Sequence, residues 1–291
     1  MNYLPEQGLG YAFMINSGSI EAYLDIDRLV QTYLTRELAA PPAPDLATVP
    51  VADQERFSGY YRSDSPRQEV LRFVEGLVGT VSIRLDEKGF SVWPLFGTAV
   101  RMHAVSDRTF RGAAGDDQAE ERVATAVLID DPREGLAVQK DGTTFRKVSA
   151  LSAWAERALV GSWLLMTLSA ELFAPVWGLR WLIRRLRGWP TILMRAVPLA
   201  AVLCLEGVLF ALSTDDLIAR FGNFTFWSFG LFLATLGFGV LSVLGLWLAF
   251  RARKVGVNRW ALLHSLGFSV ANVLVTGYLA YWGWIGIRLW R

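Results

Sequence analysis

Four long runs of apolar residues occupy the C-terminal part of the chain. They lie at 158–179, 191–213, 226–250 and 260–287, and short polar connections separate them. A helix needs about 20 mostly apolar residues to cross the hydrocarbon core of a bilayer. Each run is that long, so the pattern predicts an integral membrane protein whose residues 158–291 form a four-helix transmembrane bundle.

The charges beside these runs indicate their orientation. The first and third connections are basic, whereas the middle one carries Asp215, Asp216 and Arg220. The basic residues are Arg180, Arg184, Arg185, Arg187, Arg251, Arg253, Lys254 and Arg259. Because positively charged loops stay in the cytoplasm, we expect both basic connections there. Residues 1–156 would then be extracytoplasmic, on a bacterial inner or cell membrane.

The first 38 residues predict one strand and one helix. The short apolar run 9–15 is typical of a buried strand, and Ser19 can cap a helix over 20–38 whose apolar residues recur at helical spacing. One strand and one helix cannot enclose a core. We therefore expect this unit to need a sheet that the chain does not supply.

A linker and a β-domain follow. Residues 39–55 are rich in Pro and Ala, which is typical of a semi-rigid linker. Residues 56–149 predict a small antiparallel β-barrel of lipocalin-like type, with a short helix around Phe73 and a tight hairpin turn at Asp141-Gly142. The predicted strands are 80–85, 90–94, 99–104, 109–112, 123–129, 136–140 and 143–148.

Composition removes several classes of function. The formal net charge is only +2, and no basic stripe interleaved with exposed aromatics predicts nucleic-acid binding. Cys204 is the one cysteine, and His103 and His264 lie far apart, so we expect no disulfide and no metal site. A phosphate loop would need Gly-Lys-Ser or Gly-Lys-Thr, which does not occur. We therefore expect no cofactor, and membrane lipid as a partner.

Polar residues inside the predicted spans are the remaining candidates for chemistry. They are Glu171, Arg195, Glu206 and Asn272. Such residues are costly in lipid and tend to face the bundle interior or a wet cavity. The two glutamates could form a proton or ion relay, which would suit a small transporter. They could instead make hydrogen bonds between helices, as we expect for Asn272.

Two stretches carry a family resemblance. LPEQGLGYAFMINS at 4–17, followed by the predicted helix, resembles the end of the class C β-lactamase and penicillin-binding serine hydrolase domain, where a late strand of the main sheet precedes a helix that packs across it. RFSGYYR at 56–62 is similar to the opening of the small β-barrel domain that trails many of these enzymes. Four spans after the barrel match a membrane-bound version. The resemblance makes 1–38 the C-terminal remnant of a β-lactamase-like domain.

The family's catalytic motifs are missing from this sequence. The resemblance implies Ser-x-x-Lys, Tyr-x-Asn or Ser-x-Asn, and Lys/His-x-Gly. The first two motifs do not occur, and the Lys-x-Gly match at Lys140-Asp141-Gly142 falls in the predicted turn. We therefore assign no catalytic residue.

Two readings of the function stay open. Residues 1–19 do not form a signal peptide, so we expect a truncated chain, with an export signal and a catalytic domain upstream. The implied substrates are β-lactams, D-amino acid peptides or esters. The alternative is a non-catalytic membrane protein whose extracytoplasmic barrel binds a ligand or partner.

Overall fold

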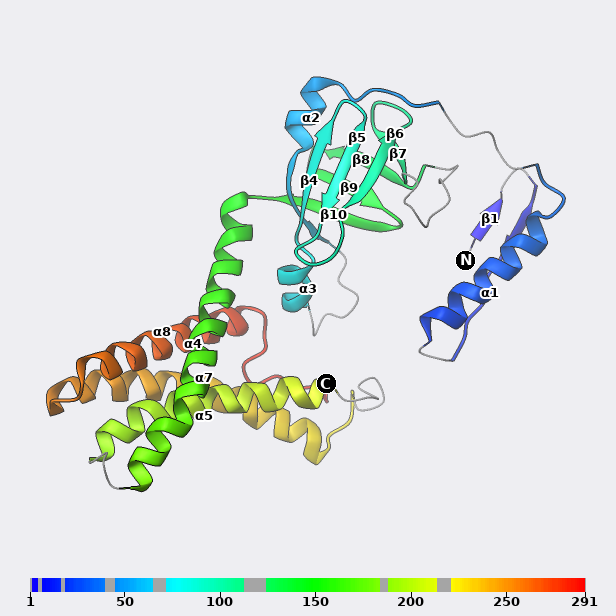
Figure 1. Cartoon of the computed structure of the whole chain (residues 1–291). Coiled ribbons are helices and arrows are strands. Elements are labelled where there is room, and N and C mark those ends of the chain that lie inside the picture. The colour runs from blue at the N-terminus through cyan, green and yellow to red at the C-terminus, as the bar shows by residue number, and fades with distance from the viewer. Residues whose placement is uncertain are drawn as a thin grey trace.

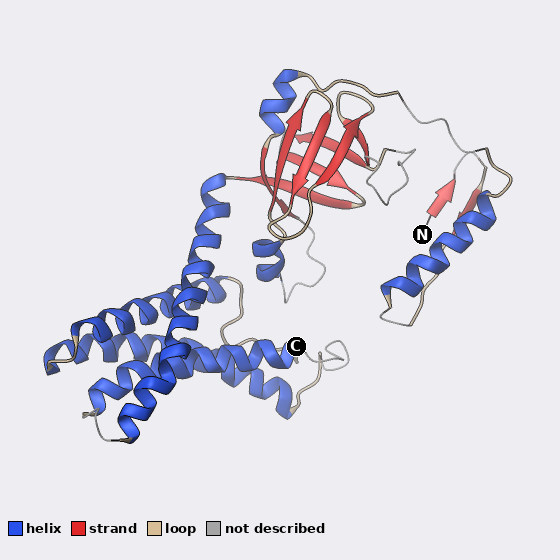
Figure 2. Ribbon diagram, in the orientation of Figure 1, coloured by secondary structure: helices blue, strands red, loops and turns tan. Residues whose placement is uncertain are grey.

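The computed structural model describes residues 2–4, 7–16, 19–39, 45–64, 72–112, 124–183, 188–213 and 221–290. Figure 1 shows three parts in chain order: an N-terminal unit of two strands and a helix, a β-barrel, and a group of long helices. Figure 2 separates the strands of the barrel from the helices on either side of it. The basic residues 184, 185 and 187, and the charged residues 215, 216 and 220, lie outside the described ranges.

Eight strands close into an antiparallel barrel in the order β10-β3-β4-β5-β6-β7-β8-β9. Every neighbouring pair is antiparallel, including the β10–β3 pair that closes it. The strands are β3 (Gly59–Ser63), β4 (Val81–Asp86), β5 (Gly89–Trp93), β6 (Val100–Ala104), β7 (Thr109–Gly112), β8 (Ala126–Asp131), β9 (Gly135–Lys140) and β10 (Thr143–Val148). Because closure leaves no free edge, every strand has two hydrogen-bonded neighbours.

Side chains fill the barrel interior. Phe57, Tyr61, Phe90, Met102 and Phe110 are at most 1% exposed and belong to one apolar cluster. An eight-stranded barrel is just wide enough either to be filled in this way or to hold one small ligand. Aromatic side chains take the central space here. The strand pairing confirms the predicted antiparallel barrel and shows that it is closed. Its likeness to a lipocalin stays a prediction.

The last hairpin of the barrel has the predicted turn. Asp141 and Gly142 have φ values of 50° and 78° and join β9 to β10. Two consecutive positive φ angles are those of the type I′ turn, whose twist matches that of the flanking strands. Lys140 pairs with Asp141 at the surface of this turn. The Lys-x-Gly match is therefore part of an ordinary hairpin.

The predicted linker contributes to the barrel at its C-terminal end. The backbone N–H of Ala47 donates to the carbonyl of Ala104, and Val49 is buried in the barrel core. Helix α2 (Val51–Phe57) then places Phe57 in the same core. The prediction of a linker over 39–55 is thus wrong for its last residues. The apolar side chains at 47 and 49 pack against the barrel core, and composition does not reveal this contact.

Four helices are long and apolar enough to cross a membrane: α4 (Ala150–Leu182), α5 (Trp189–Leu212), α7 (Phe226–Ala252), which a short 3-10 helix extends to Val255, and α8 (Arg259–Tyr281). Helix α4 begins eight residues before the predicted span. Ser149 caps it by accepting from the backbone N–H of Ser152 at 3.1 Å. Its first two turns are therefore an extension toward the barrel (Figure 1).

The predicted fourth span is wrong at its C-terminal end. Helix α8 ends at Tyr281, and the left-handed residues Gly283 and Gly286, with φ values of 73° and 69°, fold the chain back. Trp284 and Leu289 are then 2% and 7% exposed within the bundle core. The apolar character of 282–287 reflects burial in a returning segment, which hydropathy alone does not distinguish from a continuing helix.

The N-terminal unit consists of a hairpin, β1 (Asn2–Leu4) with β2 (Leu9–Tyr11), and helix α1 (Ile20–Thr35). The predicted cap is present, since Ser19 Oγ accepts from the N–H of Ala22 at 3.2 Å. The prediction of a buried strand over 9–15 is wrong. The strand has three residues, and Met14 is 97% exposed, because no second layer covers this unit in the described part of the chain.

Candidate functional site

Asn272 joins three helices of the bundle. Its side chain is completely buried, accepts a hydrogen bond from Nε1 of Trp163 in α4 at 2.8 Å, and donates to the carbonyl of Pro198 in α5 at 3.0 Å. In hydrocarbon each of these groups would otherwise lack a partner, which is costly. The residue makes the interhelical bonds expected of an amide in a span, and its side chain is buried within the bundle.

Glu171 of α4 and Glu206 of α5 lie against one another. Their side chains are within hydrogen-bonding reach, and both are partly exposed. A bond between two carboxyl groups exists only while one of them carries a proton. Such a bond would join α4 to α5 and would satisfy polar groups that lipid cannot satisfy. It is compatible with both the structural and the relay hypotheses, which remain predictions.

Arg195 lies apart from the two glutamates, in a cavity of about 660 Å³ between α4, α5 and α8. Arg180 and His264 line the same cavity, and both interact electrostatically with Arg195. Nη1 of Arg195 is buried and has no hydrogen-bond partner among the described residues. The His264 ring is hydrogen-bonded through Nε2 to Ser169 Oγ at 2.9 Å. The cavity is therefore lined by two guanidinium groups and an imidazole.

The barrel and the bundle meet through polar bonds. Arg62 of β3 pairs with Glu156 of α4 at 2.7 Å, and both side chains are about four-fifths buried. Arg157 donates to the carbonyl of Thr80 at 2.7 Å, and the indole N–H of Trp154 donates to the Tyr60 hydroxyl at 3.0 Å. These bonds all come from the N-terminal turns of α4. They fix the first turns of this helix against the barrel.

An apolar contact supports the same junction. Helix α3 (Arg72–Val78), which the sequence predicted around Phe73, places that ring 4.6 Å from Trp284 and 6.4 Å from Tyr278, measured between ring centroids. Val70, three residues before Phe73, lies outside the described residues. The segment that follows α8 thus packs against α3.

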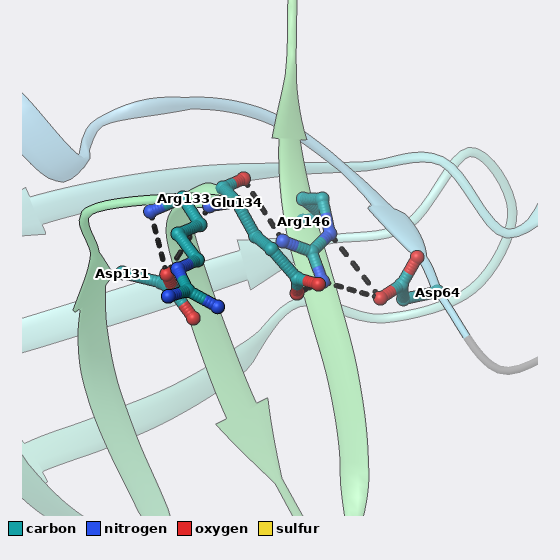
Figure 3. A network of polar contacts seen from close by, with 5 residues as sticks. All are labelled: Asp64, Asp131, Arg133, Glu134 and Arg146. Atoms are coloured by element: carbon teal, nitrogen blue, oxygen red, sulfur yellow. Dashed lines mark hydrogen bonds and ion pairs between the residues drawn. The ribbon is translucent and has the colours of Figure 1, made fainter.

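A charged network lies at one rim of the barrel (Figure 3). Arg146 of β10 binds Asp64 at 2.6 Å and Glu134 at 2.5 Å, and both acceptors raise its pKa. The backbone N–H groups of Arg133 and Glu134 donate to Asp131 and lower its pKa. The network ties β10 to the end of β3 and to the β8–β9 turn. Its members bond to one another, so we interpret the network as a structural one.

The described residues show no site that could bind a metal ion. No group of three His, Cys, Asp or Glu residues there is placed to hold a metal ion. His103 lies on β6, opposite Gly89 of β5, and belongs to the barrel wall. Cys204 is partly buried in α5 and near Gly237 of α7. A structural role for both residues stays a prediction.

The fold and the intramembrane site together define a class: a membrane protein with four candidate spans and an eight-stranded antiparallel barrel. No family model, no curated protein and no solved structure matches the chain. Functional inference therefore comes from the surfaces and cavities of this molecule.

Sequence reasoning found Arg195 and missed its cavity. The sequence indicates Arg180 only as a charge that orients the spans, and His264 only as a histidine too far from His103 to share a metal ion. One signal was available, since all three residues lie near the same end of the predicted bundle. The sequence does not show that α4, α5 and α8 leave a cavity between them at this end of the bundle.

Proposed function

We propose that this chain is the membrane-anchoring, barrel-bearing part of a β-lactamase-like serine hydrolase. In this proposal the hairpin and helix α1 complete the sheet of the hydrolase domain, and the bundle holds the barrel beside that domain outside the membrane. The hydrolase domain would supply the serine acyl-enzyme chemistry, on the same polypeptide or a separate one. Its substrates would be β-lactams, D-amino acid peptides or small esters.

The exposed apolar side chains of α1 carry this proposal. Ile26, Leu29 and Tyr33 lie on one side of α1 and are 40%, 70% and 62% exposed, and Figure 1 shows the unit lying apart from the barrel. A group of exposed apolar side chains on one side of a helix outside the membrane is typical of a protein contact. A two-stranded hairpin is also only marginally stable alone. Both elements would gain stability by packing on a larger sheet.

The hairpin side of α1 is already used. The Tyr11 hydroxyl donates to Asp27 at 2.6 Å, and the rings of Phe13 and Tyr23 stack with centroids 4.9 Å apart. These contacts hold the segment after β2 against the helix, in the strand-then-helix order of the resemblance. They leave the face around Leu29 for the proposed domain.

An experiment can test whether a protein with a reactive serine is bound or covalently joined to the barrel. Source membranes are treated with a fluorescent fluorophosphonate, which labels activated serines, and the protein is captured with an antibody against the barrel. We expect the captured material to be labelled. A label on the barrel band places the hydrolase on the same polypeptide, and a label on a second band places it on a separate one.

Matched variants connect that label to α1. Leu29→Asp should remove most of the captured label, because a carboxylate would be buried in the proposed contact. Leu46→Asp is the control, since Leu46 is similarly exposed, at 62%, in the linker. Unlabelled protein from wild-type membranes would overturn the proposal and favour a non-catalytic membrane protein whose barrel contacts a partner.

A further inference from the structure

The cavity around Arg195 opens toward the region that lipid would occupy. Its walls include Phe173, Val176 and Trp260, whose side chains are 59%, 54% and 81% exposed. All three belong to candidate membrane spans, in α4 and α8. Large apolar side chains exposed on a span face acyl chains. A molecule could therefore enter this cavity sideways from the bilayer.

The charge inside the cavity has one sign. Arg180 and Arg195 are cationic at all relevant pH values, His264 adds a polar ring, and none of the described residues that line the cavity is acidic. The unpartnered Nη1 of Arg195 is a buried donor. A charged donor atom that is buried without a partner is costly in a low dielectric. The cavity thus provides donors and positive charge for an anion.

The depth of these groups matches that of lipid headgroups. Arg195 lies six residues after the start of α5 and His264 five residues after the start of α8, which is about 8 to 9 Å along each helix. Arg180 lies in the last turn of α4, at the same end of the bundle. The polar zone of a leaflet is several ångströms thick, so these side chains lie near its boundary with the hydrocarbon.

We propose that this cavity is a binding site for an anionic phospholipid. The phosphate would lie between the guanidinium groups of Arg180 and Arg195, since guanidinium forms paired hydrogen bonds with phosphate oxygens. One acyl chain would follow Phe173 and Val176 out to the bilayer. A zwitterionic lipid offers the same chains but adds a cation of its own beside the arginines. Selectivity therefore rests on the net charge of the headgroup.

Native mass spectrometry of the full chain tests this site. The protein is released from nanodiscs that contain equal amounts of phosphatidylglycerol and phosphatidylcholine, and the retained lipids are counted. We expect wild-type protein to retain phosphatidylglycerol preferentially. Arg195→Gln should lower that preference about fivefold, the effect of one basic residue near an anionic lipid surface, whereas Arg195→Lys should keep most of it.

Arg251→Gln is the matched control. Arg251 lies at the end of α7 on the same side of the bundle, stacks on Trp247, and does not line the cavity. Its loss should leave the preference unchanged. Equal losses in Arg195→Gln and Arg251→Gln would overturn the proposal in favour of general surface attraction, and so would an absence of preference in the wild type. Displacement of the lipid by millimolar glycerol phosphate would assign the site to a soluble phosphate instead.

Discussion

Asn272 illustrates how one residue can organise a bundle in lipid. Hydrophobic burial gives helices little reason to associate in hydrocarbon, so polar bonds between them carry more of the specificity. Through Trp163 and Pro198, Asn272 connects α8 to α4 and α5. The sequence marked this residue because it is an amide within an apolar run. It could not reveal which groups the amide would meet.

We predict that Asn272→Leu destabilises the bundle by about 1 to 2 kcal/mol, since two interhelical bonds are lost and each is worth roughly 0.6 kcal/mol or somewhat more. Unfolding of the full chain in mixed micelles would measure the loss. Thr276→Val is the control, because Thr276 bonds only to the backbone of Asn272 in its own helix. Equal stability of the Asn272→Leu variant and wild type would contradict the prediction.

A second residue-scale prediction concerns pH. The pKa of Asp86 is lowered chiefly by its hydrogen bond to Arg101, at 2.6 Å. A carboxyl group whose pKa is lower in the folded state stabilises the fold above its unfolded pKa of about 3.9, and that contribution is lost as pH falls through the folded value. The difference in melting temperature between wild type and Asp86→Asn should therefore be largest above about pH 5.

Thermal melts of the full chain in detergent, from about pH 6 to about pH 3, would test the Asp86 prediction. The advantage of the wild type over Asp86→Asn should shrink as the medium becomes more acidic. Asp107→Asn provides the comparison, since Asp107 is exposed in the β6–β7 turn. An advantage that grows on acidification would reverse the sign and refute the assignment.

At the scale of elements, glycine spacing explains the closeness of α5 and α7. A Cβ added at Gly245 would come within 3.2 Å of the ring and backbone nitrogen of Pro198, and one at Gly239 within 3.4 Å of Ile285 and Thr276. Small residues of this kind let helices in a membrane approach closely. Gly230 does not take part, because a Cβ there would meet nothing within 4 Å.

We predict that Gly245→Ala destabilises the bundle by about 1 to 3 kcal/mol, the usual result of forcing an extra methyl group into a packed interface. Gly230→Ala should be neutral, or slightly stabilising through its better helix propensity. Unfolding of both variants in micelles gives the comparison. Equal effects at the two positions would show that helix propensity, and not the contact with Pro198, governs them.

At the scale of the whole molecule, the barrel and the bundle are joined by more than a covalent link. Helix α4 leaves the barrel directly after β10, and its first turns bond back to β3 and Thr80 through Glu156 and Arg157. Phe73 adds an apolar contact to the returning segment. The barrel should therefore stay close to the membrane on the side where α4 begins.

The orientation of this assembly follows from its charges. The ends of α4 and α7 that lie away from the barrel carry Arg180, Arg251 and Arg253, so we predict that they face the cytoplasm. In a Cys204→Ser background, the Glu87→Cys variant of the barrel should react with an impermeant maleimide added to intact cells. The Arg253→Cys variant should not react. The opposite labelling pattern would contradict the predicted topology and would show that the barrel lies inside the cell.

The sequence alone determined the features that depend on local patterning. Apolar run length located the four spans, and alternation and turn residues located seven of the eight barrel strands, all but β3. Asp141-Gly142 specified a type I′ turn because few residues adopt positive φ there. These signals are short in range. Each can be read wherever it occurs, without knowledge of the neighbours that the residues will meet.

Tertiary structure alone decided the features that depend on pairing across the chain. It set the closure of β10 on β3, the return of Trp284 into the bundle, the three-helix bond at Asn272, and the cavity that holds Arg195. The physical reason is common to all four. An apolar or polar side chain has the same local pattern whether it meets lipid, solvent or another helix, and only folding selects its partner.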